Sequence, residues 1–158
     1  MELPIVTRLR SELATLQHEV KHELPKRLEE AAAHGDLREN AEYDAAKNRQ
    51  ALVRARLGAL QARVSELAAY SLARLPRNRV SYGSTVVCED ANTGAETTFK
   101  VLFPEEVDGT DGQISIGSPI GRALLNHEVG DEVLVVTPQG RRNLEIIELT
   151  TLHDRESE

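Results

Sequence analysis

Two long stretches of the sequence repeat apolar residues at the spacing of paired α-helices, and this repeat limits the folds open to the chain. Within each stretch the intervals alternate between four and three residues, as the seam between two helices requires. The two stretches therefore predict an antiparallel helical hairpin within residues 1–74, with arms of about 45 Å. The seam residues are Leu9, Leu13, Leu16 and Val20 in the first stretch and Val53, Leu57, Leu60, Val64 and Leu67 in the second.

The first stretch departs from this repeat near Leu24. The intervals from Val20 to Leu24 and from Leu24 to Leu28 are both four residues, so the apolar stripe gains one residue there. An inserted residue of this kind locally unwinds a coiled coil. Pro25 also lacks the backbone N–H that a helix interior uses. We therefore expect a kink or bend near Leu24.

The segment between the two stretches is acidic and begins with a glycine. Gly35 suits the left-handed conformation that ends many helices. Asp36 suits the N-cap of the second helix, with Glu39 at the third helical position, and capping alone would account for both acids. It does not account for Glu42 and Asp44. A cluster of ionised carboxylates at a helix N-terminus instead suits a hard cation such as Mg²⁺.

Beyond residue 79 the apolar period changes from that of a helix to that of a strand. Residues 138–140 predict a hairpin turn, and Ser118-Pro119 predicts the start of a short helix. The expected fold class is α+β: a helical coiled-coil hairpin over residues 1–74, a linker over 75–79, and a small antiparallel sheet with one helix over 80–158. Strands are expected at 85–89, 97–103, 113–116, 132–137 and 143–149.

Charge and cysteine content limit the functions and the cellular compartments that are possible for this protein. Residues 1–79 hold 14 Lys and Arg against 11 Asp and Glu, a net charge of +3, whereas residues 80–158 have a net charge of −10. The acidic second half is poorly suited to phosphate binding. The single cysteine, Cys88, lies in an apolar run and predicts a buried, inert thiol in a reducing compartment. No targeting or membrane-spanning segment is recognisable, so we expect a cytoplasmic protein without a membrane partner.

The sequence His18-Glu19-Val20-Lys21-His22 matches the H-E-x-x-H motif of zinc proteases. Each histidine lies two positions from a seam residue, which predicts that both point to solvent. An exposed coiled-coil surface offers neither a third ligand nor a dry pocket, and catalytic zinc requires both. Zinc catalysis is therefore not expected here.

Basic residues recur every seven positions along the second helix. Arg49, Arg56 and Arg63 form this stripe, with Lys47 and Arg54 close by. The stripe has two interpretations. It is either a solvated face paired with acids of the first helix, or a surface that attracts the phosphates of a nucleic acid.

The run GDLRENAEYDAAKNRQ, residues 35–50, resembles the signature of the GreA/GreB family of bacterial transcript cleavage factors. Residues 118–125 and 130–133 resemble the C-terminal domain of the same family, and the blocks occur in the family's order and spacing. The resemblance implies an FKBP-like fold for the second half. It also implies a factor that enters the secondary channel of RNA polymerase and stimulates cleavage of the nascent RNA 3′ end in backtracked complexes.

The resemblance further implies roles for individual residues. Asp36 and Glu39 would be the catalytic acids and would hold a second Mg²⁺ shared with the polymerase, with no cofactor in the isolated protein. The protein would then be an accessory factor and not an enzyme by itself. Asn40, Glu42, Tyr43 and Asp44 would support the tip, Lys47, Arg49 and Arg56 would contact RNA, and Ser118, Pro119 and Arg122 would dock on the polymerase.

Two alternatives remain open at this point. The first is a protein of the same shape that inhibits the polymerase from the secondary channel, and the second is a non-catalytic helical-hairpin binding module. FKBP-like folds also occur in prolyl isomerases, which use an aromatic-lined pocket. With only Tyr82, Phe99 and Phe103 as aromatic residues in this half, isomerase activity is not expected.

Overall fold

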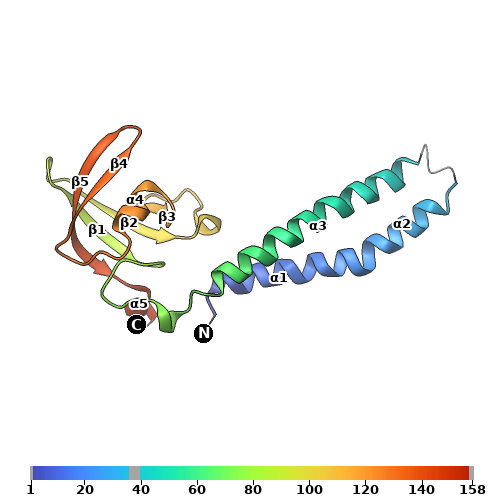
Figure 1. The fold of residues 1–158 in the computed structure, drawn as a ribbon, viewed down its shortest axis with the longest axis horizontal. Helices are drawn as coiled ribbons and strands as arrows, with labels where there is room; N and C mark the ends of the chain where they lie inside the picture. Colours follow the sequence, from blue (N-terminus) through green and yellow to red (C-terminus); the bar gives the residue numbers. More distant parts are fainter. Residues whose placement is uncertain (1, 36–39, 157–158) are drawn as a thin grey trace. The chain divides into compact units, whose positions relative to one another are not determined.

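The computed structural model describes residues 2–35 and 40–156, and the chain divides into two compact units, residues 1–71 and 72–158. The first unit is helical and the second is built on a β-sheet (Figure 1). No helix within the described ranges is both long and apolar enough to cross a membrane.

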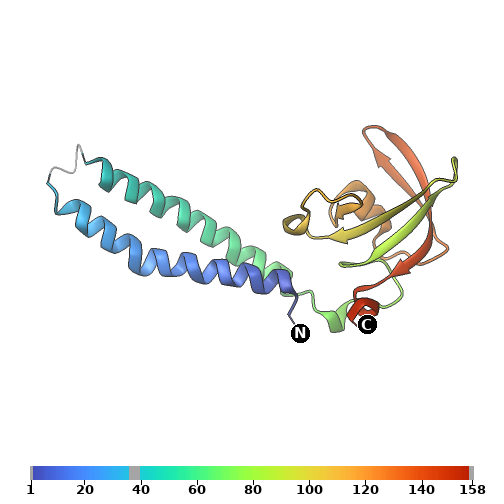
Figure 2. The same ribbon diagram turned by 180° about the vertical axis from the view of Figure 1, so that it is seen from behind.

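The first unit is a hairpin of two helical arms. Helix α1 (Pro4–His18), a π-helical turn η1 (Glu19–Glu23) and helix α2 (Leu24–Ala32) follow one another in the first arm, and α3 (Ala41–Leu67) forms the second. Both α1 and α2 pack against α3, as the two opposite views in Figures 1 and 2 show. The predicted antiparallel hairpin is confirmed.

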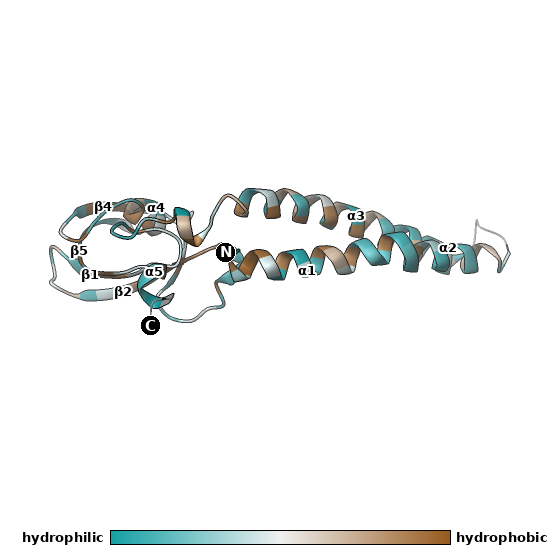
Figure 3. Ribbon diagram, turned by 90° about the horizontal axis from the view of Figure 1, so that it is seen from below, coloured by the Kyte–Doolittle hydropathy of each residue, from teal (hydrophilic) through white to brown (hydrophobic). Residues whose placement is uncertain are grey.

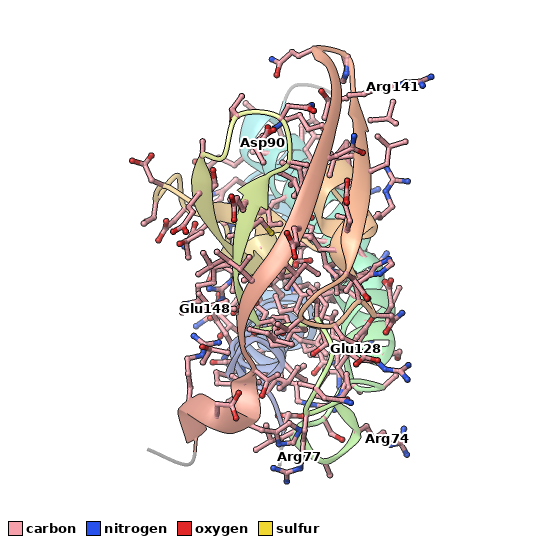
Figure 4. All side chains as sticks on the ribbon, turned by 90° about the vertical axis from the view of Figure 1, so that its left-hand side faces the viewer. Arg74, Arg77, Asp90, Glu128, Arg141 and Glu148 are labelled. Carbon is pink, nitrogen blue, oxygen red and sulfur yellow. The ribbon has the colours of Figure 1, made fainter. Side chains whose placement is uncertain are left out.

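Apolar side chains at the predicted positions form the seam between the arms. Apolar residues recur along α1 and α3, whereas α2, at the far end of the first arm, is largely hydrophilic (Figure 3). A Leu or Val side chain that is fully removed from water contributes about 1.5–3 kcal/mol to folding. Those of Leu9, Leu24, Val53, Leu60, Val64 and Leu67 are buried, and those of Leu13, Leu16, Val20, Leu28 and Leu57 are partly buried.

The irregular spacing near Leu24 is accommodated by the π-helical turn. The backbone N–H of Leu24 donates to the carbonyl of Glu19, five residues earlier. A π turn holds more residues than an α turn, so it takes up the additional residue in the apolar stripe. Pro25 follows in the first turn of α2, where a missing N–H costs least. The irregularity expected at this position is therefore present as a π turn.

The second unit contains a five-stranded sheet in the order β3-β2-β1-β5-β4. Its strands are β1 (Thr85–Asp90), β2 (Glu96–Leu102), β3 (Gln113–Ser115), β4 (Glu132–Thr137) and β5 (Gly140–Thr150). All five predicted strands are present, and the predicted turn at 138–140 joins β4 to β5.

One strand pairing differs from the prediction. Strands β2 and β3 are parallel, so the sheet is mixed and the expected all-antiparallel arrangement is wrong. The chain between them contains the 3₁₀ turn η3 (Pro104–Glu106) and returns before β3 begins. Such a crossover is what parallel pairing requires, whereas a tight turn can only join antiparallel strands.

Two short helices accompany the sheet, one more than predicted. Helix α4 (Pro119–Leu124) begins where Ser118-Pro119 indicated, and α5 (Leu152–Glu156) was not expected. Thr151 and Asp154 cap α5 reciprocally. The Thr151 N–H donates to Oδ2 of Asp154 at 2.8 Å, and the Asp154 N–H donates to Oγ1 of Thr151 at 3.4 Å. This Thr-x-x-Asp capping pattern is the signal in the sequence that marks α5. A short 3₁₀ turn, η2 (Leu72–Arg74), precedes the sheet.

The core of the second unit lies on one face of the sheet. Cys88 belongs to it, is fully buried, and its burial raises the pKa of the thiol to about 11. The predicted burial of Cys88 is confirmed, and such a thiol is unreactive at neutral pH. The core residues are Val80, Val86, Cys88, Phe99, Val101, Leu124, Val133, Val135, Leu144 and Ile146.

Candidate functional site

The tip of the hairpin is bounded by the end of α2 and the start of α3. After α2 ends at Ala32, Gly35 has a φ of +123°, a conformation that favours glycine, as predicted. Helix α3 begins at Ala41, and its N-cap is Asn40. The predicted N-cap, Asp36, is wrong for this helix, because the helix starts later and Asn40 makes the capping hydrogen bond.

Asn40 connects the two arms of the hairpin. Its Oδ1 accepts a hydrogen bond from the backbone N–H of Tyr43 at 3.1 Å, which satisfies one of the free donors at the start of α3. Its Nδ2 donates to the carbonyl oxygen of Ala31, in the last turn of α2, at 2.5 Å. One amide side chain thus uses both of its polar atoms to hold the end of α2 against the start of α3.

The acids assigned from the resemblance flank this connection in the sequence. Asp36 and Glu39 lie outside the described residues, so their assignment as metal ligands stays a prediction. Glu42 and Asp44 are in the first turn of α3 and both are exposed. The positive end of the α3 dipole lies at this turn and attracts anionic groups.

A shallow groove of about 270 Å³ lies beside the tip, between α2 and α3. Tyr43, in the first turn of α3, is half-buried, and Nζ of Lys47 lies 5.5 Å from the centroid of its ring, within the range of a cation–π contact. This contact positions the Lys47 ammonium one helical turn behind the tip. The groove is lined by Arg27, Glu30, Ala31, His34, Glu42 and Ala45.

Two of the three arginines of the α3 stripe are paired with acids of the first arm, and the third pairs with an acid of α3 itself. Arg49 binds the carboxylate of Glu19 through two nitrogens, at 2.7 and 2.9 Å, and Arg56 binds Glu12 in the same way, at 3.1 and 3.3 Å. The hydrogen bond from Arg49 lowers the pKa of Glu19. This arrangement agrees with the first interpretation of the stripe, a face paired with acids. RNA contact by Arg49 and Arg56 stays a prediction.

The residues expected to dock on the polymerase surround the start of α4. Oγ of Ser118 accepts from the N–H of Gly121 at 3.1 Å and donates to the carbonyl of Ser115 at 2.7 Å, so this hydroxyl shapes the turn itself. Pro119 and Arg122 are exposed. Of the three, only these two side chains are available to a partner surface, and their docking role stays a prediction.

The remaining motifs carry no catalytic arrangement in the described residues. His18 and His22 are exposed, as predicted. Tyr82 and Phe103 are buried and stacked at 4.3 Å between ring centroids, and the Tyr82 hydroxyl donates to Glu106 at 2.9 Å. Phe99 lies in the core of the sheet. These aromatic rings are therefore used in packing.

Both units match known sequence families. Residues 5–68 match the family described as "Transcription elongation factor, N-terminal", and residues 75–151 match that described as "Transcription elongation factor, GreA/GreB, C-term". The chain is 41% identical to transcription elongation factor GreA of Syntrophobacter fumaroxidans over 142 residues, which cover 90% of this chain and 91% of the relative. It is 43% identical to the GreA of Desulfovibrio desulfuricans over 139 residues, which cover 88% and 85%.

A similar solved structure is that of GreA factor homolog 1 (Gfh1) of Thermus thermophilus, with 30% identity, coverage of 92% of this chain and 94% of that one, and a TM-score of 0.43. The sequence matches fall on both units and extend over about nine-tenths of the chain. The chain belongs to the GreA/GreB family of transcription elongation factors.

Proposed function

We propose that this protein enters the secondary channel of RNA polymerase and stimulates cleavage of the RNA 3′ end in backtracked complexes. Family membership implies an interaction with RNA polymerase. The observation that carries the proposal is the Asn40 connection, which holds the two arms together next to the acidic segment. The protein would contribute side chains to the active site of the polymerase and would cleave no RNA alone.

Asp36 and Glu39 are the residues that would hold the second Mg²⁺. Carboxylate oxygens are the ligands that this hard cation prefers, and the N-terminus of α3 favours neighbouring acids in their ionised form. Bound beside another metal ion, Mg²⁺ stabilises the attacking and leaving oxygens of phosphodiester hydrolysis. A site with only two protein carboxylates should bind Mg²⁺ weakly in the isolated protein.

The surrounding residues receive different roles in this proposal. Lys47 is exposed and oriented by the Tyr43 ring, so it is well placed to meet RNA phosphates near the tip. Arg49 and Arg56 chiefly hold the arms together through Glu19 and Glu12. The exposed side chains of Pro119 and Arg122 would contact the polymerase from α4.

The test is cleavage of RNA in stalled, backtracked polymerase complexes, analysed on a sequencing gel. Asp36→Asn preserves the size of the side chain but removes its charge, so we expect it to bind polymerase and to lose stimulated cleavage. The matched control is Glu29→Gln, which removes an exposed acid from α2 and should stimulate cleavage like the unmodified protein.

Undiminished cleavage by Asp36→Asn would contradict the metal-ligand role. Slower cleavage in the presence of the unmodified protein than in its absence would favour the inhibitor of the same shape. The names of the relatives at about 40% identity support the cleavage factor over that alternative.

A further inference from the structure

We propose that His18 and His22 form a binding site for a single first-row transition-metal ion, such as Zn²⁺, on the side of the first arm. The two imidazole rings lie one helical turn apart, with 4.9 Å between their centroids and 42° between their planes. Both side chains are exposed, so an ion reaches them from solvent. Neutral imidazole is the commonest protein ligand for these metals, and two histidines four residues apart on a helix can bind one ion.

The π-helical turn adds a carboxylate to this pair. His18 is the last residue of α1, and His22 and Glu23 belong to η1. Oε1 of Glu23 lies 3.7 Å from Nε2 of His18. Residues five positions apart on an α-helix are separated by about 140° around the axis. The wider π turn brings such residues to a common side, and the carboxylate favours the approach of a cation.

The arrangement favours binding without hydrolysis. Glu19, the glutamate of the H-E-x-x-H motif, would be the general base in a zinc protease. Here its carboxylate receives two hydrogen bonds from Arg49, at 2.7 and 2.9 Å, and these hydrogen bonds lower its pKa. Within the described residues no group of three or more ligands surrounds a metal position, so water would complete the coordination shell.

Binding would stabilise the first arm. The ion bridges the end of α1 and the π turn, and it requires the two rings at their helical spacing, which the unfolded chain does not maintain. A ligand that binds only the folded state shifts the unfolding equilibrium towards that state by mass action. At free Zn²⁺ concentrations above the dissociation constant, each tenfold rise in concentration should therefore raise the ratio of folded to unfolded helical unit about tenfold.

The experiment is titration of the full chain with Zn²⁺ at pH 7.5 by isothermal calorimetry, together with urea unfolding followed by circular dichroism. We expect one ion per chain in a site that His18→Gln or His22→Gln abolishes. His34→Gln, which removes another exposed histidine of the same unit, is the matched control and should retain the site. Glu23→Gln should weaken binding several-fold.

A second metal sharpens the test. Mg²⁺ should not replace Zn²⁺, because it prefers oxygen ligands to imidazole nitrogen. Unchanged Zn²⁺ binding by His18→Gln with an unchanged helical spectrum would overturn the proposal. Loss of the site in His34→Gln alone would also overturn it. No polymerase is present, so the result is independent of the proposed function in transcription.

Discussion

Replacing Asn40 by alanine tests whether one side chain holds the tip of the hairpin together. The variant removes the N-cap acceptor for the Tyr43 N–H and the donor to the Ala31 carbonyl. Loss of an N-cap side chain costs about 0.5–2 kcal/mol. Loss of a hydrogen bond between neutral groups costs about 0.5–1.5 kcal/mol more. We therefore expect the helical unit to lose about 1–3.5 kcal/mol of unfolding free energy.

A second variant separates the two contributions. Asn40→Asp retains a good N-cap acceptor but replaces the donor facing the Ala31 carbonyl with a carboxylate oxygen. It should lose the hydrogen bond between the arms, about 1 kcal/mol, and the carboxylate should in addition repel the Ala31 carbonyl oxygen. Asn48→Ala, on the exposed surface of α3, is the control and should change stability by less than about 0.5 kcal/mol.

The assay is urea unfolding of the full chain followed at 222 nm, where the helical unit dominates the signal. Amide hydrogen exchange supplies a local measurement, because the Tyr43 N–H should exchange faster in Asn40→Ala than in Asn40→Asp. A urea midpoint for Asn40→Ala equal to that of Asn48→Ala would refute the reasoning. Equal exchange rates of the Tyr43 N–H in Asn40→Asp and Asn40→Ala would show that the cap contributes nothing separate.

Two further predictions concern glycines and pH. A Cβ at Gly121 would lie 2.3 Å from the backbone oxygen of Ser115, so Gly121→Ala should destabilise the second unit by about 1–3 kcal/mol despite its better helix propensity. Gly58→Ala meets nothing within 4 Å and should stabilise α3 by about 1 kcal/mol; both are measured by urea unfolding. The pKa of Glu19 is lowered from 4.5, so its ion pair stabilises the fold above that pH. The difference in urea midpoint between the unmodified protein and Glu19→Gln should be constant at higher pH, and it should shrink as the pH falls through the lowered pKa.

Features that depend on residues close in sequence could be predicted. The four-and-three spacing of apolar residues placed the seam. Its interruption predicted an irregularity near Leu24, expected as a kink or bend, and the structure has a π turn there. Alternation of apolar residues placed the five strands, and Ser118-Pro119 placed α4. The second short helix was missed although its Thr151–Asp154 capping pattern is also local.

The candidate site was only partly predictable. The residues of the acidic segment were recognised as a group, but the N-cap was assigned to Asp36 instead of Asn40. Several residues of this segment are acceptable N-caps, and the choice depends on where the α2 carbonyls lie. Asn40 is selected because it also reaches Ala31, nine residues earlier in the chain.

By itself, the sequence determined the helical hairpin, the strands and the family, because periodicity and motif are properties of neighbouring residues. Only the tertiary structure decided that Arg49 pairs with Glu19, thirty residues away, and that β3 lies parallel to β2. Such contacts depend on how elements pack across the fold, and local spacing contains no information on which distant partner is reached.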